Sequence, residues 1–138
     1  MSGALTESMY VQPQTQLTGG TTYAEVAGTK IDAHGQPYRT VGYSVALPTS
    51  NYAAVVKVQG RIAQDDDGDW VDLKAFDETG TQHSSADVDI AAGGRKYLIL
   101  TPNAISGAHS AFREYRVMAK AKNSDADTHV RVRGIAKM

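Results

Sequence analysis

A run of aspartates is the feature of this sequence whose residue types most directly suggest chemistry. Five of them fall within eight residues: Asp65, Asp66, Asp67, Asp69 and Asp72. A calcium ion takes about six to eight oxygen ligands, and alternate aspartates can supply several of these. A calcium-binding loop, however, needs a glycine after its third ligand and a glutamate at its end, and near those places this sequence has Trp70 and Lys74. The same aspartates would keep a hairpin tip soluble, with Gly68 at a positive φ. We therefore predict no metal ligand and no cofactor, and we keep calcium binding by this run as the alternative.

Histidine and serine side chains are the next candidates for chemistry. The histidines are His34, His83, His109 and His129. None belongs to an HExxH motif or a similarly spaced ligand pair, so we interpret all four as solvated surface residues. The residue types of a hydrolase triad do occur close together, as His83, Ser84, Ser85 and Asp87. The sequence has no GxSxG nucleophile elbow, and a triad is assembled by the fold rather than by adjacency in the chain. We predict that the chain is not an enzyme and has no catalytic residues.

The single tryptophan, Trp70, opens a strand-like run just after the aspartates. An exposed indole ring can act as a stacking platform for a sugar, as in carbohydrate-binding modules. A tryptophan beside a hairpin turn more often packs over the edge or the core of a sheet. We expect the packing role for Trp70 and keep ligand stacking as the alternative.

The composition limits the classes of partner. The chain has 138 residues, no cysteine and a formal net charge of −1. Disulfides and thiolate metal sites are excluded, and the charge gives no general affinity for nucleic acid or an anionic membrane. The first residues lack the pattern of a signal peptide, and no run approaches the roughly 18 apolar residues of a membrane span. We expect a soluble, single-domain protein made in the cytoplasm.

Charge is distributed unevenly along the chain. Residues 65–89 carry nine acidic side chains and one basic one, whereas residues 113–138 carry seven basic and three acidic ones. Two solvated faces of one protein would produce this pattern. A subunit whose acidic end meets a basic neighbour would produce it too. Both interpretations stay open.

Alternating apolar and polar residues predict most of the chain to be β-strand, because side chains two residues apart share one face. The predicted strands are 21–26 and 29–33 (a short hairpin around Gly28), 41–47, 51–63, 70–76, 87–91, 96–101, 113–122 and 129–137. In strand 51–63, Lys57, Gln59 and Arg61 are expected to face water. Strand 129–137 is expected to pair with 113–122 across a short turn. One conflict remains, because residues 108–122 also fit one face of a helix; we prefer the strand.

About eight antiparallel strands with short turns predict an all-β fold, a single jelly-roll-like β-sandwich over residues 21–138. Residues 1–20 are polar and weakly periodic, and we interpret them as an N-terminal arm. The arm contains scattered apolar residues that we predict to contact a partner: Leu5, Met9, Tyr10, Val11 and Leu17. Either the domain's own sheet, accepting the arm as an edge strand, or a neighbouring subunit must hold it in place.

Four short stretches, taken in order, carry a family resemblance: Val56-Lys57-Val58-Gln59-Gly60, Asp67-Gly68-Asp69-Trp70, Tyr115-Arg116-Val117 and Val130-Arg131-Val132-Arg133-Gly134. This order, over roughly residues 52–138, resembles small β-sandwich proteins of tailed-phage virions. The resemblance implies a structural role, such as capsid decoration (cement) or a head or tail accessory protein, without shared catalytic residues. It implies the major capsid protein or other virion subunits as partners, a homo-oligomer on the particle, and location in the virion. The alternative is a carbohydrate-binding or receptor-binding β-sandwich module.

Overall fold

Eleven strands form the regular structure of this protein in a computed structural model that describes residues 7–11, 15–17, 22–26, 28–32, 40–47, 53–61, 70–100, 112, 114–123 and 128–137. The strands are β1 (Glu7–Val11), β2 (Thr15–Leu17), β3 (Ala24–Glu25), β4 (Ile31–Asp32), β5 (Thr40–Ala46), β6 (Ala54–Arg61), β7 (Val71–Leu73), β8 (Val88–Ile90), β9 (Arg95–Leu100), β10 (Glu114–Ala121) and β11 (Thr128–Lys137). No helix in these ranges is long and apolar enough to cross a membrane.

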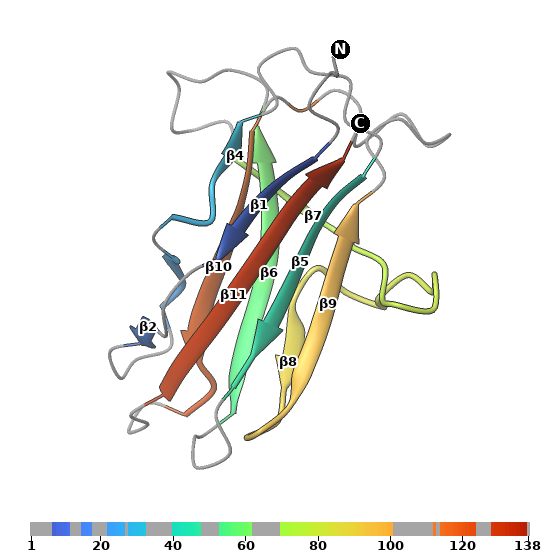
Figure 1. The fold of residues 1–138 in the computed structure, drawn as a ribbon. Helices are drawn as coiled ribbons and strands as arrows, with labels where there is room; N and C mark the ends of the chain where they lie inside the picture. Colours follow the sequence, from blue (N-terminus) through green and yellow to red (C-terminus); the bar gives the residue numbers. More distant parts are fainter. Residues whose placement is uncertain are drawn as a thin grey trace, which may run out of the picture.

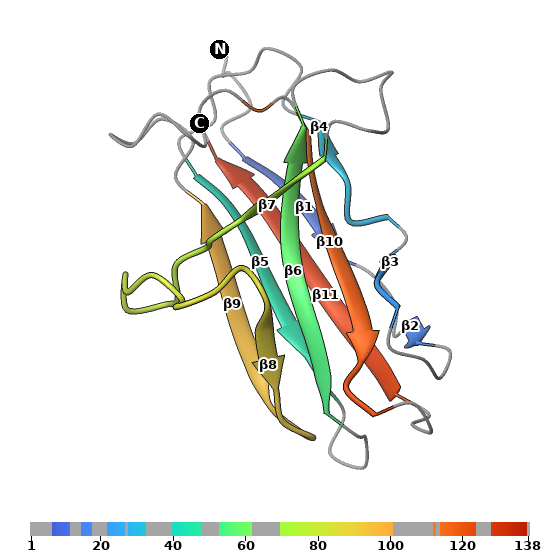
Figure 2. The same cartoon turned by 180° about the vertical axis from the view of Figure 1, so that it is seen from behind.

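Two antiparallel sheets pack face to face (Figures 1 and 2). The first sheet has the order β1-β11-β5-β9, with β2 also paired to β11. The second sheet has the order β3-β10-β6-β7, with β4 also paired to β10 and β8 to β6. Alternate residues of both sheets fill the core between them, including Val41, Tyr43, Val45, Leu98, Leu100, Val132, Val56, Val58, Tyr115 and Val117. The predicted all-β sandwich is therefore confirmed.

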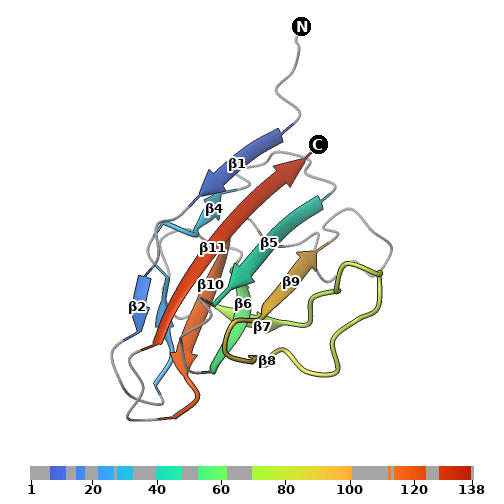
Figure 3. The ribbon, with the colours of Figure 1, turned by 60° about the horizontal axis from the view of Figure 1, so that its bottom comes forward.

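The strand pairing is nested, as in a jelly roll (Figure 3). β1 and β2 pair with β11, β3 and β4 with β10, β5 with β9, and β6 with β7 and β8. The chain therefore resembles one long hairpin rolled into two sheets, with early strands meeting late ones. This confirms the jelly-roll-like prediction.

The nested pairing corrects the expected partnership of 113–122 with 129–137. Both segments are strands, but β10 pairs with β6, whereas β11 pairs with β5, β1 and β2. Each strand buries one apolar face in the shared core, so the chain passes from one sheet to the other between them. The helical alternative for 108–122 is wrong over Glu114–Ala121, where the structure has β10.

The predicted hairpin of 21–26 with 29–33 is also wrong, because β3 and β4 both pair with β10 instead of with each other. They form one edge strand interrupted by a bulge. The Val26 N–H donates to the Val117 carbonyl (2.9 Å), and the Val117 N–H donates to the Thr29 hydroxyl (3.1 Å). Thr29 in turn donates its hydroxyl proton to the Val26 carbonyl (2.7 Å), and Gly28 takes a φ of +77° at the bend. At the bulge, the Thr29 hydroxyl thus accepts the hydrogen bond from the Val117 N–H that a backbone carbonyl would accept in a regular strand pair.

Tyr43 ties this bulge to the first sheet. Its ring is buried, and its hydroxyl donates to the Thr29 carbonyl (2.7 Å). Gly134, on the neighbouring strand, leaves the space for the ring, because a Cβ there would lie 3.0 Å from two of its carbons. Tyr43 therefore packs against β11 at Gly134, and both residues also line the groove described below.

The predicted N-terminal arm supplies β1 and β2. Met9, Tyr10 and Val11 lie on β1, Leu17 lies on β2, and both strands run antiparallel to β11. Of the two ways to hold the arm, the described residues show the domain's own sheet accepting it as an edge strand. Leu5 lies outside the described residues.

Candidate interaction surface

Trp70 lies on the outer face of the second sheet, among cations of the same chain. The Arg116 guanidinium lies 3.9 Å from its ring centroid, the Arg61 guanidinium 4.6 Å and the Lys30 ammonium 5.8 Å. The indole is partly buried in this cluster. Cations over an aromatic face are held by the ring quadrupole. The geometry favours the packing role predicted for Trp70 over an open stacking platform.

Arg61 departs from its expected position in water. Its side chain is only 5% exposed and pairs with Glu114, which is 7% exposed, at 2.5 Å. The two residues are register partners on β6 and β10, and Trp70 lies over the guanidinium. Arg61 does lie on the outer face, as alternation predicts, but Trp70 and Glu114 remove it from solvent.

Arg116 and Lys57, on the same outer face, are also paired within the chain. Arg116 donates to the side-chain amide oxygen of Gln59 (2.8 and 3.0 Å) and to the Glu25 carboxylate (2.9 Å). Gln59 donates to Asp72 (2.9 Å), and Lys57 forms an ion pair with Asp72 (3.1 Å). Burial raises the pKa of Asp72, but the hydrogen bonds from Gln59 and Lys57 and the Lys57 charge outweigh it and hold the pKa below its ordinary value. On the outer face of the second sheet, Lys57, Arg61 and Arg116 are thus each paired with a carboxylate of the same chain.

Tyr23 extends this network toward β8. Its ring lies 4.2 Å from the Lys57 ammonium and 4.5 Å from that of Lys120, and its hydroxyl donates to Asp87 (2.5 Å). Burial, the hydrogen bond to Asp87 and nearby carboxylates raise the pKa of Tyr23 well above its ordinary value. The phenol therefore stays a hydrogen-bond donor, which keeps the Asp87 carboxylate engaged.

His83, Ser84, Ser85 and Asp87 line a small polar pocket of about 290 Å³, in which His83, Ser85 and Asp87 form hydrogen bonds other than those of a triad. The His83 Nε2 is hydrogen-bonded to the Tyr97 carbonyl (2.8 Å), which fixes it as a donor. Asp87 accepts from Tyr23, and its backbone N–H donates to the Ser85 hydroxyl (3.2 Å). Among the described residues, no hydrogen bond links either serine hydroxyl to the imidazole. This arrangement gives no nucleophile and base pair.

His83 instead helps to close the edge of β9. The loop of residues 74–87 runs beside that strand (Figures 1 and 2), where Phe76 and Ile99 exchange two backbone hydrogen bonds (2.8 and 2.9 Å). The His83 ring donates a hydrogen bond to the backbone carbonyl of Tyr97, two residues before Ile99. Covering unpaired backbone groups in this way blocks the addition of another strand. At these positions the first sheet offers a partner its face and not its edge.

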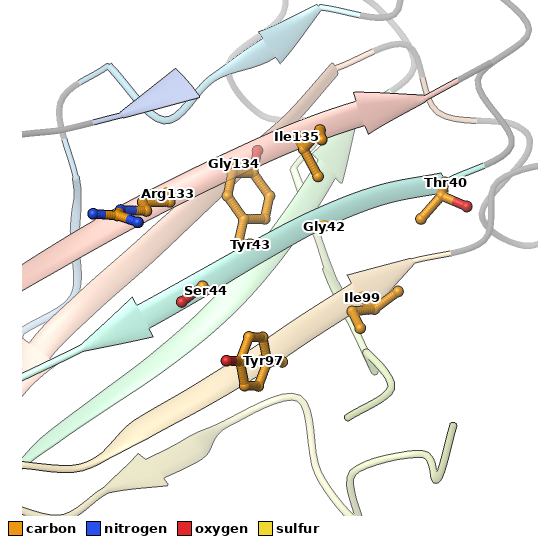
Figure 4. Close-up of a pocket in the computed structure, with 9 residues that line it drawn as sticks. All are labelled: Thr40, Gly42, Tyr43, Ser44, Tyr97, Ile99, Arg133, Gly134 and Ile135. Carbon is orange, nitrogen blue, oxygen red and sulfur yellow. The ribbon is translucent and has the colours of Figure 1, made fainter. Parts of the chain in front are cut away.

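A shallow groove crosses the outer face of the first sheet (Figure 4). Ile135 on β11 and Ile99 on β9 are both register partners of Gly42 on β5, so a glycine lies between two isoleucines. A Cβ at Gly42 would meet only the Cγ1 atom of Ile99 and the Cγ2 atom of Ile135, at 3.8 and 3.9 Å. The groove has a volume of about 330 Å³ and mostly apolar walls, and it is lined by Thr40, Gly42, Tyr43, Ser44, Tyr97, Ile99, Arg133, Gly134 and Ile135.

Arginines continue this face beyond the groove. The next row across β11, β5 and β9 is Arg133–Ser44–Tyr97, and the row after it is Arg131–Ala46–Arg95. The three arginines, Arg95, Arg131 and Arg133, are exposed. Within the part of the chain that the structure describes, none of the three has a carboxylate partner. This contrasts with the outer face of the second sheet, where the arginines are paired.

The other residues singled out from the sequence are not brought together where the structure describes them. Asp65, Asp66, Asp67 and Asp69 lie outside the described residues, as do His34 and His109, whereas Asp72 lies on β7 and His129 on β11. No group of three or more metal-ligating side chains occurs among the residues that are described. The groove was not predicted from the sequence. Leu98-Ile99-Leu100 was a usable signal, because this run places apolar side chains on both faces of one strand.

Of the residues predicted to contact a partner, Met9 is the register partner of Ile135 and so lies beside the groove.

Comparison with known proteins gives a likeness of fold. No protein-family model and no curated protein matches the chain. The SPBc2 prophage-derived protein YomS aligns over 96% of this chain and 93% of its own, with 11% identity and a TM-score of 0.58. PirA aligns over 96% and 93% with 12% identity and a TM-score of 0.49. A protein of the disulfide-linked pili of Bacillus endospore appendages aligns over 96% and 88%, with 9% identity and a TM-score of 0.47. The resemblance to phage β-sandwich proteins is thus confirmed at the level of the fold.

Proposed function

We propose that this chain is a non-enzymatic structural protein of a virion, and that it decorates the capsid by binding across subunit junctions. The observation that carries the proposal is the difference between the two outer faces. One face pairs Lys57, Arg61 and Arg116 with carboxylates of the same chain, whereas the other presents exposed arginines that have no carboxylate partner among the described residues, beside an apolar groove. A face of the second kind is suited to bind another protein.

The fold likeness supports a phage origin for the proposal. YomS is described as prophage-derived, and its alignment covers nearly the whole of both chains. The sequence resemblance to tailed-phage β-sandwich proteins leads to the same class of protein. The partners under this proposal are the major capsid protein or other virion subunits, with several copies of this chain on one particle.

A decoration protein stabilises a shell by mass action, because it binds the assembled state and not the separated subunits. At a free concentration about 100 times its dissociation constant, such binding stabilises each site by about 2.7 kcal/mol. The chemistry required is surface burial and charge pairing, without a catalytic step. The described residues supply both, through the groove and the arginines of the first sheet.

The alternative, a carbohydrate-binding or receptor-binding module, needs an aromatic platform open to its ligand. Trp70 is the aromatic residue expected to supply it, and cations of the same chain lie over its ring. This geometry favours the structural role over the glycan-binding one.

Particles purified from the strain that encodes this chain test the proposal. Mass spectrometry should find the chain in stoichiometric amounts, and immunogold labelling should place it on the capsid. A particle population that lacks the protein would contradict the virion role, and labelling confined to the tail would contradict the decoration role. A glycan array that retains the wild-type protein, but not the Trp70→Ala variant, would support the alternative.

A further inference from the structure

The groove can hold one large apolar side chain. Antiparallel strands lie about 4.8 Å apart, so β11 and β9 flank β5 with about 10 Å between them. Gly42 leaves the middle of this span empty, between Ile99 and Ile135. An engineered apolar cavity of about 150 Å³ already holds benzene, and the volume here is about 330 Å³. A leucine, isoleucine or phenylalanine side chain fits this space.

The arginines follow the groove at the spacing of an extended peptide. The three rows are Ile135–Gly42–Ile99, Arg133–Ser44–Tyr97 and Arg131–Ala46–Arg95, each two residues from the last. Two residues of a strand span about 6.8 Å, and an extended peptide places its own alternate side chains at the same interval. Consider a peptide that lies along β5 with one apolar residue in the groove. The residues two and four positions away from that apolar residue, on one side of it, would then lie over the arginines. Guanidinium groups bind carboxylates with two parallel hydrogen bonds.

Other occupants fit this face less well. Two copies meeting face to face would bring together six arginines of like charge. The acidic segment 77–89 of a second copy has no exposed large apolar side chain for the groove, because Val88 is buried and its other residues are small, polar or charged. Strand addition along β9 is blocked by Phe76 and His83 of the loop 74–87, which bind backbone groups of that strand. A nucleic acid would also gain from the arginines, but the Tyr43 ring is buried, so among the residues lining the groove only Tyr97 could stack on a base.

We infer that the groove between Ile99 and Ile135 is the docking site for an extended, acidic segment of a partner protein. That segment has one large apolar residue and carboxylates two and four positions away from it. The inference rests on the proposed function, because it names the partner chemistry of the same face. It extends that function to a recognition pattern that a capsid or other virion subunit should contain.

A defined peptide tests this without any virion. The probe is Ser-Leu-Ser-Glu-Ser-Glu-Ser, titrated into the full chain while the isoleucine methyl signals are followed by NMR. Binding should shift the methyls of Ile99 and Ile135, and Gly42→Leu, which fills the groove, should weaken binding at least about tenfold. Arg133→Glu should weaken it similarly, whereas Lys74→Glu, an equal charge change on the exposed loop, should leave it unchanged. Ala92→Leu is the matched control for added apolar bulk, at an exposed turn.

Three further probes separate the alternatives. A peptide with lysines in place of the glutamates should shift neither methyl; equal shifts from both peptides would overturn the charge part of the inference. A short oligodeoxythymidine that shifts the same methyls more strongly than the acidic peptide would overturn the choice of a protein partner. Self-association of the wild type that Gly42→Leu abolishes would identify a second copy as the occupant and overturn the inference too. Peptide binding in a protein absent from particles would refute only the virion role.

Discussion

Removing Glu114 should be among the most destabilising changes on the outer face of the second sheet. The Glu114→Ala variant leaves the Arg61 guanidinium, 5% exposed in its side chain, without its carboxylate. Breaking one side of a buried pair typically costs about 3–5 kcal/mol, because the remaining charge stays out of water and loses that partner. A single domain is stable by only about 5–15 kcal/mol, so this loss is a large fraction of the total.

The same loss converts to a melting temperature. The unfolding entropy is about 2.1 cal/mol/K per residue, which for 138 residues gives about 0.29 kcal/mol/K. Glu114→Ala should therefore lower the melting temperature by about 10–17 °C. Calorimetry gives the shift, and urea unfolding gives the free energy independently.

Two further variants isolate the cause. The double change Arg61→Met with Glu114→Leu removes both charges and keeps apolar volume, so its stability should be close to that of the wild type or above it. Lys122→Ala breaks an exposed pair with Asp89, whose side chains are 49% and 65% exposed, and should cost less than about 1 kcal/mol. If Glu114→Ala cost no more than Lys122→Ala, the pair would not be desolvated, and the account of Trp70 as its cover would be refuted.

Three other predictions concern packing, an aromatic contact and pH. Gly60→Ala should destabilise by about 1–3 kcal/mol in urea unfolding, because its Cβ would lie 2.9 Å from a Phe112 ring carbon, whereas Gly42→Ala, whose Cβ has ordinary contacts, should change stability by less than about 0.5 kcal/mol. Trp70→Ala should lower the free energy of unfolding by about 2 kcal/mol, because cation–π contacts and packing are lost. If the variant lost less stability than a substitution at an exposed surface residue, the indole ring would be open to solvent. Asp72 and Asp77 have pKa values below their ordinary range, Asp72 as described above and Asp77 through hydrogen bonds from the hydroxyl and backbone of Thr79 and the backbone of Thr81. The stability that these two carboxylates contribute is present above the unfolded pKa of about 3.9, and it is lost as the pH falls through the lower folded pKa values. The double variant Asp72→Asn with Asp77→Asn should therefore lose less stability than the wild type when the pH is lowered through this range. An unchanged loss of stability in acid would contradict this prediction.

Strand positions could be predicted from the sequence because alternation is a local property. The segment 113–122 alternates apolar and polar residues, and the structure has β10 there. The pairing of the strands could not be predicted, because a jelly roll pairs strands that are far apart in the chain. Alternation shows which residues share a face but not which strand lies beside them. The hairpin expected around Gly28 failed for this reason, since both of its halves found the same distant partner, β10.

Burial on the outer faces was equally hard to predict. Alternation put Arg61 on the outer face correctly, but its exclusion from water depends on Trp70 and on Glu114 from another strand. The groove depends on three strands meeting in register, so that Gly42 lies between two isoleucines. Such a groove is a property of the assembled sheet. The sequence signal for it was the run Leu98-Ile99-Leu100, which places apolar side chains on both faces of one strand.

Cosedimentation with particles from the encoding strain, stripped of this protein, tests the central claim most directly. The full chain should rebind saturably, and Gly42→Leu should not, although its circular dichroism and melting temperature show a folded domain. Ala92→Leu should rebind as the wild type does. Absence of wild-type binding would contradict the virion role, and equal binding by Gly42→Leu would contradict attachment through the face of the first sheet.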